Sequence, residues 1–206
     1  MKTLRIYPTS INLQYIDEAV AVLRRGGLII YPTDTFYAIG CSALNNGAIE
    51  RLCQAKGINP QKVTLSVVCS DISQASEYAR IDNYAFRMLR DNLPGPFTFI
   101  LPASTSLPKV FKGRRNVGIR IPDNAIATAL AEALGNPLLS TSITLNADSG
   151  DDEIEADTIE LEYQHDSSIA LMIDGGTGRL TGSTVVDLTD SNSPEIVRQG
   201  LGTLAE

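Results

Sequence analysis

Three consecutive polar residues, Thr33, Asp34 and Thr35, follow a short apolar run (28–31) and Pro32. The run is predicted to be a buried strand that ends at Pro32, because proline cannot donate to a strand ladder. Ligands of open α/β sheets tend to bind where strands end. A turn held by local hydrogen bonds from the same hydroxyl and carboxylate groups is the alternative. The pattern therefore predicts either a ligand contact or a structural turn.

One arginine, Arg120, lies within a predicted strand of alternating apolar residues, 117–121. Successive side chains of a strand point to opposite faces, so Ile119 and Ile121 point away from it. A charge on the inner face of a strand is costly unless it is paired. The partner is either an acidic side chain such as Asp34 or a bound ligand.

Two lysines, Lys56 and Lys62, flank a turn-like segment, 57–60. Lys56 ends a predicted helix (46–56), where a cation is stabilised by the helix dipole by about 0.3–1 kcal/mol. That is a sufficient structural reason for the lysine. The functional alternative is a clamp for a phosphate or a carboxylate.

Four further cations, Lys109, Lys112, Arg114 and Arg115, form a basic cluster in an otherwise acidic chain. An exposed loop with solvated charges explains them. The functional alternative is contact with the phosphates of a nucleotide or an RNA.

Two loop-like segments also carry candidate ligand groups. Hydroxyl residues follow a predicted strand at 140–144, where side chains and freed backbone N–H groups can bind an anion. The glycine-rich segment 175–184 lacks the Gly-Lys-Ser/Thr ending of a P-loop, and a predicted strand rather than a helix follows it, which excludes that motif. The remaining functional interpretation is a loop that closes over a ligand.

The composition of the chain limits the functions and sites that can be expected of it. The chain has 206 residues and a formal net charge of −7, which argues against coating nucleic acid through bulk charge. One histidine (His165) and three cysteines fit neither a zinc site nor a Ser-His-Asp triad, so no metal site is predicted. The cysteines are expected to be buried thiols in a reducing cytosol. No apolar run approaches the roughly 20 residues of a membrane span, and the first ten residues do not resemble a signal peptide.

The elements predicted between these segments give the fold class. Helices are predicted from about residue 11 to 25, with Thr9 and Ser10 before the first turn, and at 46–56, 72–78, 83–92 and 125–134. Strands are predicted at 28–31, 64–68, 97–101, 117–121, 138–141, 169–173, 184–188 and 195–197. The acidic stretch 148–162 is predicted to be a solvated helix or loop. The order predicts a single α/β domain over residues 1–206 with a mixed, twisted sheet.

Six segments together resemble one family across nearly the whole chain. They are GGLIIYPTDTFYAIGC (26–41), LPGPFTFILPAS (93–104), VGIRIPDN (117–124), GNPLLSTS (135–142), GSTVVDLT (182–189) and IVRQG (196–200). The sequence is similar to the YrdC/YciO family, which includes threonylcarbamoyl-AMP synthases, and it looks closest to the YciO branch.

The resemblance implies a twisted mixed sheet flanked by helices, with a concave basic surface. It also implies a cytoplasmic, monomeric nucleotidyltransferase without a prosthetic group. Such an enzyme uses ATP with Mg²⁺, L-threonine and bicarbonate to form threonylcarbamoyl-AMP, which is consumed in modifying adenosine 37 of tRNA. This chemistry depends on positioning and on neutralising phosphate charge, and it needs no catalytic histidine.

The same resemblance implies a set of binding residues, but it assigns no residue a catalytic role. The implied contacts to the threonine-like substrate are Thr35, Lys62, Arg120, Ser140 and Ser183. The implied contacts to the nucleotide and its phosphates are Lys56, Ser142, Thr144 and Arg198.

Two positions depart from the family pattern. The Arg of its Lys-x-Arg signature is replaced by Ile58, and the Asn of its Ser-x-Asn signature is replaced by Thr144. A hydrogen bond to a charged group is worth about 1.5–3 kcal/mol, so the missing Arg predicts weaker handling of a polyphosphate. Three interpretations stay open: a weak synthase, an enzyme with a changed substrate, and a non-catalytic binder of tRNA or double-stranded RNA. The last would use the same cavity with Lys109, Lys112, Arg114 and Arg115.

Overall fold

The computed structural model describes residues 1–59, 65–107, 115–143, 152–190 and 193–205. Its helices are α1 (Leu13–Arg24), α2 (Asn46–Ala55), α3 (Ile72–Tyr78), α4 (Asn83–Asn92), α5 (Ala125–Leu134) and α6 (Ala156–Tyr163). Its strands are β1 (Lys2–Arg5), β2 (Leu28–Tyr31), β3 (Ala38–Ser42), β4 (Ser66–Val68), β5 (Phe97–Pro102), β6 (Asn116–Arg120), β7 (Leu138–Ser142), β8 (Glu153–Ile154), β9 (Ile169–Asp174), β10 (Gly178–Arg179), β11 (Thr184–Asp187) and β12 (Glu195–Arg198).

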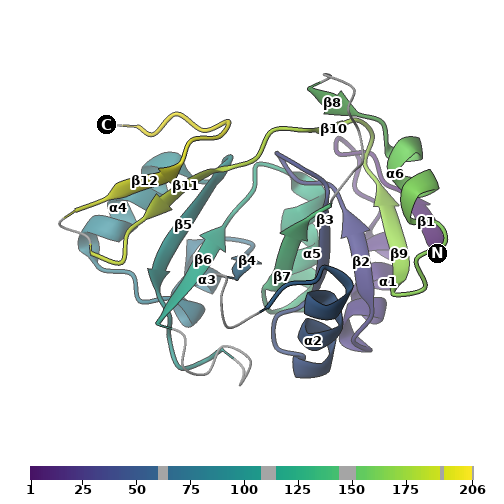
Figure 1. Ribbon diagram of the computed structural model, residues 1–206, viewed down its shortest axis with the longest axis horizontal. Helices are drawn as coiled ribbons and strands as arrows, with labels where there is room; N and C mark the ends of the chain where they lie inside the picture. Colours follow the sequence, from purple (N-terminus) through teal and green to yellow (C-terminus); the bar gives the residue numbers. More distant parts are fainter. Residues whose placement is uncertain (60–64, 108–114, 144–151, 191–192, 206) are drawn as a thin grey trace.

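Ten of these strands form one mixed sheet, in the order β1-β9-β2-β3-β7-β4-β6-β5-β11-β12. The pairs β1–β9, β9–β2, β4–β6 and β5–β11 are parallel, and the other neighbours are antiparallel. Strands β8 and β10 form a separate antiparallel pair. The predicted α/β fold with a mixed sheet is confirmed (Figure 1).

The ends of the helices follow local side-chain chemistry. Helix α1 begins after Asn12, whose side-chain oxygen accepts hydrogen bonds from the backbone N–H groups of Gln14 and Tyr15 at 3.0 and 3.4 Å. Thr9 and Ser10 precede the helix, as predicted, and the capping residue is Asn12. Asparagine is among the preferred capping residues, because its side-chain oxygen can accept hydrogen bonds from the N–H groups of the first turn. Helix α5 ends at Gly135, whose φ of 76° is in the left-handed region that glycine adopts without strain.

Two strands of the sheet were not predicted. Strand β3 directly follows the polar segment 33–35 and pairs antiparallel with β2, Tyr31 opposite Ala38. All five of its residues are buried, so the inside–outside alternation that marks a strand is missing. Strand β1 holds the edge position beside β9, and its four residues are too short a run to show a pattern. In the acidic stretch, α6 begins at Ala156 after the short strand β8.

The sheet is covered on both faces. Leu28 and Ile30 of β2 pack into the larger core cluster, which includes the buried side of α2. Ile29 and Tyr31, on the other face, pack into a second cluster with α1 and α5. Figure 1 shows α2 in front of the sheet and α1 and α5 behind it. Residues of β2 are buried on both sides, which explains why the strand is an unbroken apolar run.

The centre of the sheet brings small polar residues together. Ser66 of β4 is opposite Ser140 of β7 on one side and Gly118 of β6 on the other. A β-carbon on Gly118 would lie 2.5 Å from the Ser66 Oγ and 3.1 Å from the Thr98 Cγ2. The glycine therefore lets hydroxyl side chains from β4 and β5 approach each other across β6.

Burial of the thiols is confirmed, because Cys41, Cys53 and Cys69 are all free and buried. Burial raises the pKa of Cys41 to about 12, so this thiol carries little thiolate at neutral pH. Within the described residues, no helix is both long enough and apolar enough to cross a bilayer.

Candidate functional site

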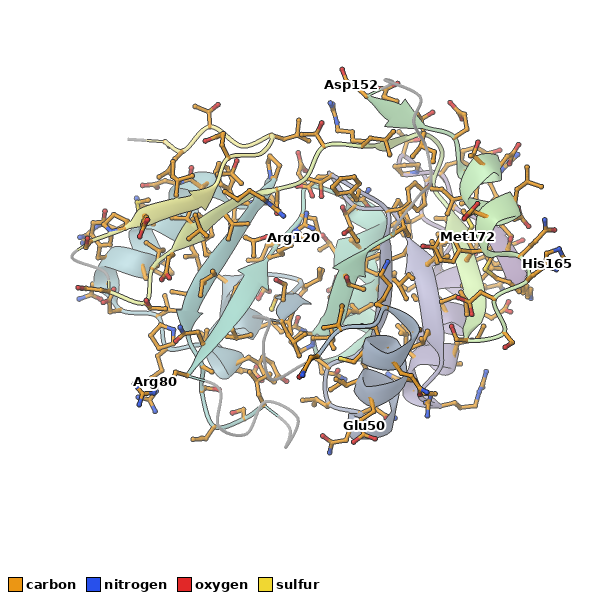
Figure 2. The ribbon with its side chains drawn as sticks, in the orientation of Figure 1. Glu50, Arg80, Arg120, Asp152, His165 and Met172 are labelled. Atoms are coloured by element: carbon orange, nitrogen blue, oxygen red, sulfur yellow. The ribbon has the colours of Figure 1, made fainter. Side chains whose placement is uncertain are left out.

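A cavity of about 180 Å³ lies beside Arg120, at the carboxyl end of β6. Figure 2 shows the position of Arg120 in the sheet. It is lined from strands on both halves of the sheet, from α2 and from three connecting segments. The lining residues are Thr35, Phe36, Ala38, Leu52, Ile58, Leu65, Ser66, Thr98, Arg120, Leu139, Ser140, Thr141, Ser142, Gly182, Ser183 and Arg198. One wall is thus aliphatic, whereas the rest presents hydroxyl groups and two guanidinium groups.

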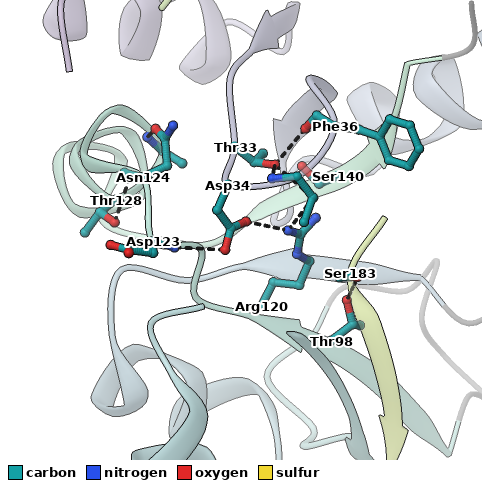
Figure 3. Close-up of polar contacts among 12 residues, drawn as sticks. Thr33, Asp34, Phe36, Thr98, Arg120, Asp123, Asn124, Thr128, Ser140 and Ser183 are labelled. Atoms are coloured by element: carbon teal, nitrogen blue, oxygen red, sulfur yellow. Dashed lines mark hydrogen bonds and ion pairs between the residues drawn. The ribbon is translucent and has the colours of Figure 1, made fainter. Parts of the chain in front are cut away.

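Arg120 is the buried cation of this cavity. Its Nη2 donates to the Asp34 Oδ1 and to the Thr35 Oγ1, each at 2.9 Å (Figure 3). The other oxygen of Asp34 accepts the backbone N–H of Asp123 at 3.1 Å. The Arg120 side chain is 13% exposed and that of Asp34 is 8% exposed. The sequence allowed either an acidic partner or a ligand for Arg120. The two are compatible, because Arg120 pairs with Asp34 and also lines the cavity.

Burial acts on both members of this ion pair. It raises the pKa of the Asp34 carboxyl above its ordinary value, while the Arg120 charge acts in the opposite direction. Burial lowers the pKa of Arg120, and Asp34 opposes that change. A guanidinium stays protonated in proteins, so Arg120 keeps its charge. The Arg120 Nε is buried without a hydrogen-bond partner among the described residues, which leaves part of this cation's donor capacity unused by the fold.

The turn at 33–37 is held by its own hydroxyl groups. The Thr33 Oγ1 donates to the Phe36 carbonyl at 2.6 Å and accepts the Thr35 N–H at 3.0 Å. The next residue, Tyr37, is buried, and its hydroxyl donates to the Gly176 carbonyl and accepts the Gly175 N–H, at 2.6 and 3.0 Å. The turn that the sequence allowed is therefore present, and it fixes Thr35 against Arg120.

Ser140 is positioned from the core side by Tyr31, with which it shares a short hydroxyl–hydroxyl hydrogen bond. Room for the phenol ring comes from Gly40, where a β-carbon would lie 2.7 Å from the ring. Burial raises the pKa of Tyr31 to about 12, although the bond to Ser140 and the charge of Arg120 favour the phenolate.

These buried phenols give a prediction for alkaline pH. Tyr31 and Tyr37 both have a pKa of about 12, so at least two of the seven tyrosines should titrate only near that pH. Unfolded tyrosines ionise near pH 10, so stability from these groups is complete below about pH 10 and falls as the pH rises further. Tyrosinate absorbance during a rapid pH titration measures this, and the absence of tryptophan keeps the signal clean. Tyr31→Phe should lose one late-titrating group, and an unchanged late phase would contradict the assignment.

Ser183 and Arg198 form a second polar wall. The Ser183 Oγ hydrogen bonds with the Thr98 Oγ1 at 2.8 Å. The Arg198 Nη2 donates to the Ser183 carbonyl at 2.8 Å and lies 3.3 Å from its Oγ. Because Arg198 belongs to β12, at the edge of the sheet, these contacts tie the edge strand to the cavity.

The cavity brings together six of the residues implied by the family resemblance: Thr35, Arg120, Ser140, Ser142, Ser183 and Arg198. Lys56 does not line it; it caps α2, and burial lowers its pKa. Arg115 is exposed at the start of β6, and His165 is exposed after α6, far from Arg120 in Figure 2. Lys62, Thr144, Lys109, Lys112 and Arg114 lie outside the described residues.

Sequence reasoning missed several lining residues. Ser66 and Thr98 are hydroxyl residues among apolar neighbours of their strands. Thr98 is buried, as are Phe97 and Phe99, so no alternation in the sequence marks it. Phe36 was not predicted to line the site, because the polar residues of the same turn were the stronger candidates. Ile58, recognised as a departure from the family pattern, lines the aliphatic wall with Leu52 and Leu65.

Comparison with known proteins agrees with the fold. The family model for Sua5, YciO and YrdC proteins, described as "Telomere recombination", matches residues 21–200. YciO of Escherichia coli (strain K12) is 39% identical over 199 residues, which cover 96% of this chain and 94% of YciO. The crystal structure of E. coli YciO matches with a TM-score of 0.86, at 38% identity, and covers 98% of both chains.

More distant relatives include enzymes of named activity. The threonylcarbamoyl-AMP synthase of Mus musculus is 35% identical over 196 residues, covering 90% of this chain and 66% of the mouse protein. The structure of P. abyssi Sua5 complexed with L-threonine matches with a TM-score of 0.84 at 28% identity, covering 97% of this chain and 58% of Sua5. The chain therefore belongs to the Sua5/YciO/YrdC family.

Proposed function

We propose that this protein is a threonylcarbamoyl-AMP synthase-like nucleotidyltransferase. In the proposed reaction, the amine of L-threonine and bicarbonate form a carbamate with loss of water. A carbamate oxygen then attacks the α-phosphorus of ATP, and pyrophosphate leaves. Mg²⁺ enters as part of the nucleotide substrate.

The observation that carries the proposal is the buried Arg120 beside the Thr35 hydroxyl in a cavity of amino-acid size. A guanidinium with unused donors suits a carboxylate, which it can bind through two parallel hydrogen bonds. The hydroxyl groups of Ser140 and Ser142 offer contacts for the polar remainder of a small amino acid. Support also comes from the synthases among the relatives and from the Sua5 structure with L-threonine.

The described lining residues indicate how the site would work. None of them is a histidine, cysteine, lysine or carboxylate, so the lining offers charge and hydroxyl groups but no ordinary general base. Arg120 would hold the amino acid, and Arg198 would contact the nucleotide at the other polar wall. Catalysis would come from holding the carbamate in line with the α-phosphorus and from neutralising phosphate charge.

Isothermal titration with ATP, AMP and L-threonine, separately and together with Mg²⁺ and bicarbonate, tests the proposal alongside a pyrophosphate-release assay. The expected result is ATP binding that strengthens with threonine, and pyrophosphate release that needs both. L-Alanine, which lacks the hydroxyl and one methyl group, is the matched substrate control. Folded protein that releases no pyrophosphate with all three substrates present would overturn the proposal.

A further inference from the structure

We propose that Phe36, beside Gly182 and Arg198, forms a stacking platform for the base of the nucleotide at the mouth of the cavity. The inference rests on the proposed function, because the nucleotide is the substrate of that reaction. It adds a residue, Phe36, that selects for a planar heteroaromatic group.

The first support is the fixed presentation of the Phe36 ring. Phe36 lines the cavity and is only partly buried, whereas its neighbours Thr35 and Tyr37 are buried. Its carbonyl accepts the Thr33 hydroxyl at 2.6 Å, and the Arg179 N–H donates to the Thr35 carbonyl at 3.2 Å. In Figure 3 the ring extends away from Thr33 and Asp34. The backbone at residues 35 and 36 is therefore fixed by hydrogen bonds, and the Phe36 ring lies outside the core.

The second support is the space at Gly182. A β-carbon there would lie 3.2 Å from the Phe36 Cε2 and 3.3 Å from the Arg198 Nη2, so both planar groups rest against this glycine. The Arg198 guanidinium is held in place by the Ser183 carbonyl, at 2.8 Å from Nη2 and 3.3 Å from Nε. A β-carbon at 182 would require the ring or the guanidinium to move by a few tenths of an ångström.

The third support is the size of the cavity. Its volume of about 180 Å³ lies below the roughly 300–1,000 Å³ of pockets that enclose a drug-sized ligand. If an amino acid occupies the Arg120 end, the base of a nucleotide has to lie at the rim. Bases stack on aromatic rings and on guanidinium planes, and Phe36 and Arg198 supply one of each.

A Phe36→Trp variant places a fluorescent indole at the proposed platform, and its emission can be measured alone because the chain has no tryptophan of its own. Stacking of a purine on the new indole should quench its fluorescence. The expected result is saturable quenching by ATP and AMP, at the concentrations where heat is released, and none by ribose 5-phosphate or L-threonine. Binding of ATP by calorimetry without any change in indole emission would overturn the platform.

A Phe36→Leu variant keeps an apolar side chain and removes the ring. ATP binding should weaken about tenfold while L-threonine binding stays unchanged, since stacking acts only on the base. The matched control is Phe86→Leu, at a 46% exposed phenylalanine of α4 outside the cavity, which should bind as the wild type does.

The outcomes separate the two proposals. If the wild type binds ATP and Phe36→Leu binds it equally well, the platform is wrong and the proposed function stands. If the wild type binds neither ATP nor AMP with threonine and Mg²⁺ present, both are wrong. If ATP binding is lost together with threonine binding in Phe36→Leu, the ring has a general structural role, and the platform is again wrong.

Discussion

Arg120→Ala is expected to destabilise the protein by about 3–5 kcal/mol, because it leaves the buried Asp34 carboxylate without its cation. Removing the guanidinium takes away the charge that holds the pKa of Asp34 down, so this pKa should rise further in the variant. A carboxyl whose folded-state pKa lies above the unfolded value costs stability above that pKa, and the cost disappears as the pH falls. The deficit measured by urea unfolding should therefore be larger near about pH 8 than near about pH 5.

Two companion variants separate folding from binding. Arg120→Lys keeps a cation beside Asp34 but lacks the planar fork, so it should retain much of the stability and still bind L-threonine more weakly. Adding Asp34→Asn to Arg120→Ala removes the unpaired charge, and the double variant should recover stability and lose the pH dependence. Folded Arg120→Ala that binds threonine and ATP as the wild type does would remove Arg120 from the site.

Ile58→Arg is expected to strengthen ATP binding, by about one to two decades. Ile58 lines the aliphatic wall of the cavity, at the position where the synthase signature has an arginine. A charge-assisted hydrogen bond is worth about 1.5–3 kcal/mol, and an arginine can make two of them to one phosphate group. ATP titration and pyrophosphate release with threonine and bicarbonate measure the gain.

The control for this variant is Ile58→Gln, which adds length and polarity at the same wall without charge. It should leave ATP binding close to the wild-type value. Tm measurements on both variants are needed, because Ile58 packs against the main core cluster and its loss costs some stability. If Ile58→Arg folds and binds ATP no better than Ile58→Gln, the aliphatic wall does not face the phosphates.

Local signals in the sequence predicted most elements of the fold. Helix 125–134, for example, was bounded correctly because Gly135 ends an alanine-rich run. Strand β3 was missed because its burial on both faces erases the alternation that identifies a strand. Strand β1 was missed because its order depends on β9, which is more than 160 residues away (Lys2 is paired with Leu171).

The site could be predicted only in part. Arg120 stood out because a charge in an apolar strand needs a partner, and Asp34 was named as one candidate. The sequence could not show that Ser66 and Thr98 approach across Gly118, since that depends on the strand order β4-β6-β5. Nor could it show that Gly182 lies beside both Phe36 and Arg198, because Phe36 is distant from the other two residues in the chain.

The strand order also constrains when the cavity can exist. Strand β2 pairs with β9, β3 pairs with β7, and β5 pairs with β11. The sheet is therefore held together by pairing between distant parts of the chain. The lining residues extend from Thr35 to Arg198, which means that the ribosome has to release residue 198 before the cavity is complete. Non-local pairing of this kind folds slowly, and a ligand that binds only the finished cavity favours the native state by mass action. Substrate in the cell would therefore stabilise only those molecules in which β12 has already joined the sheet.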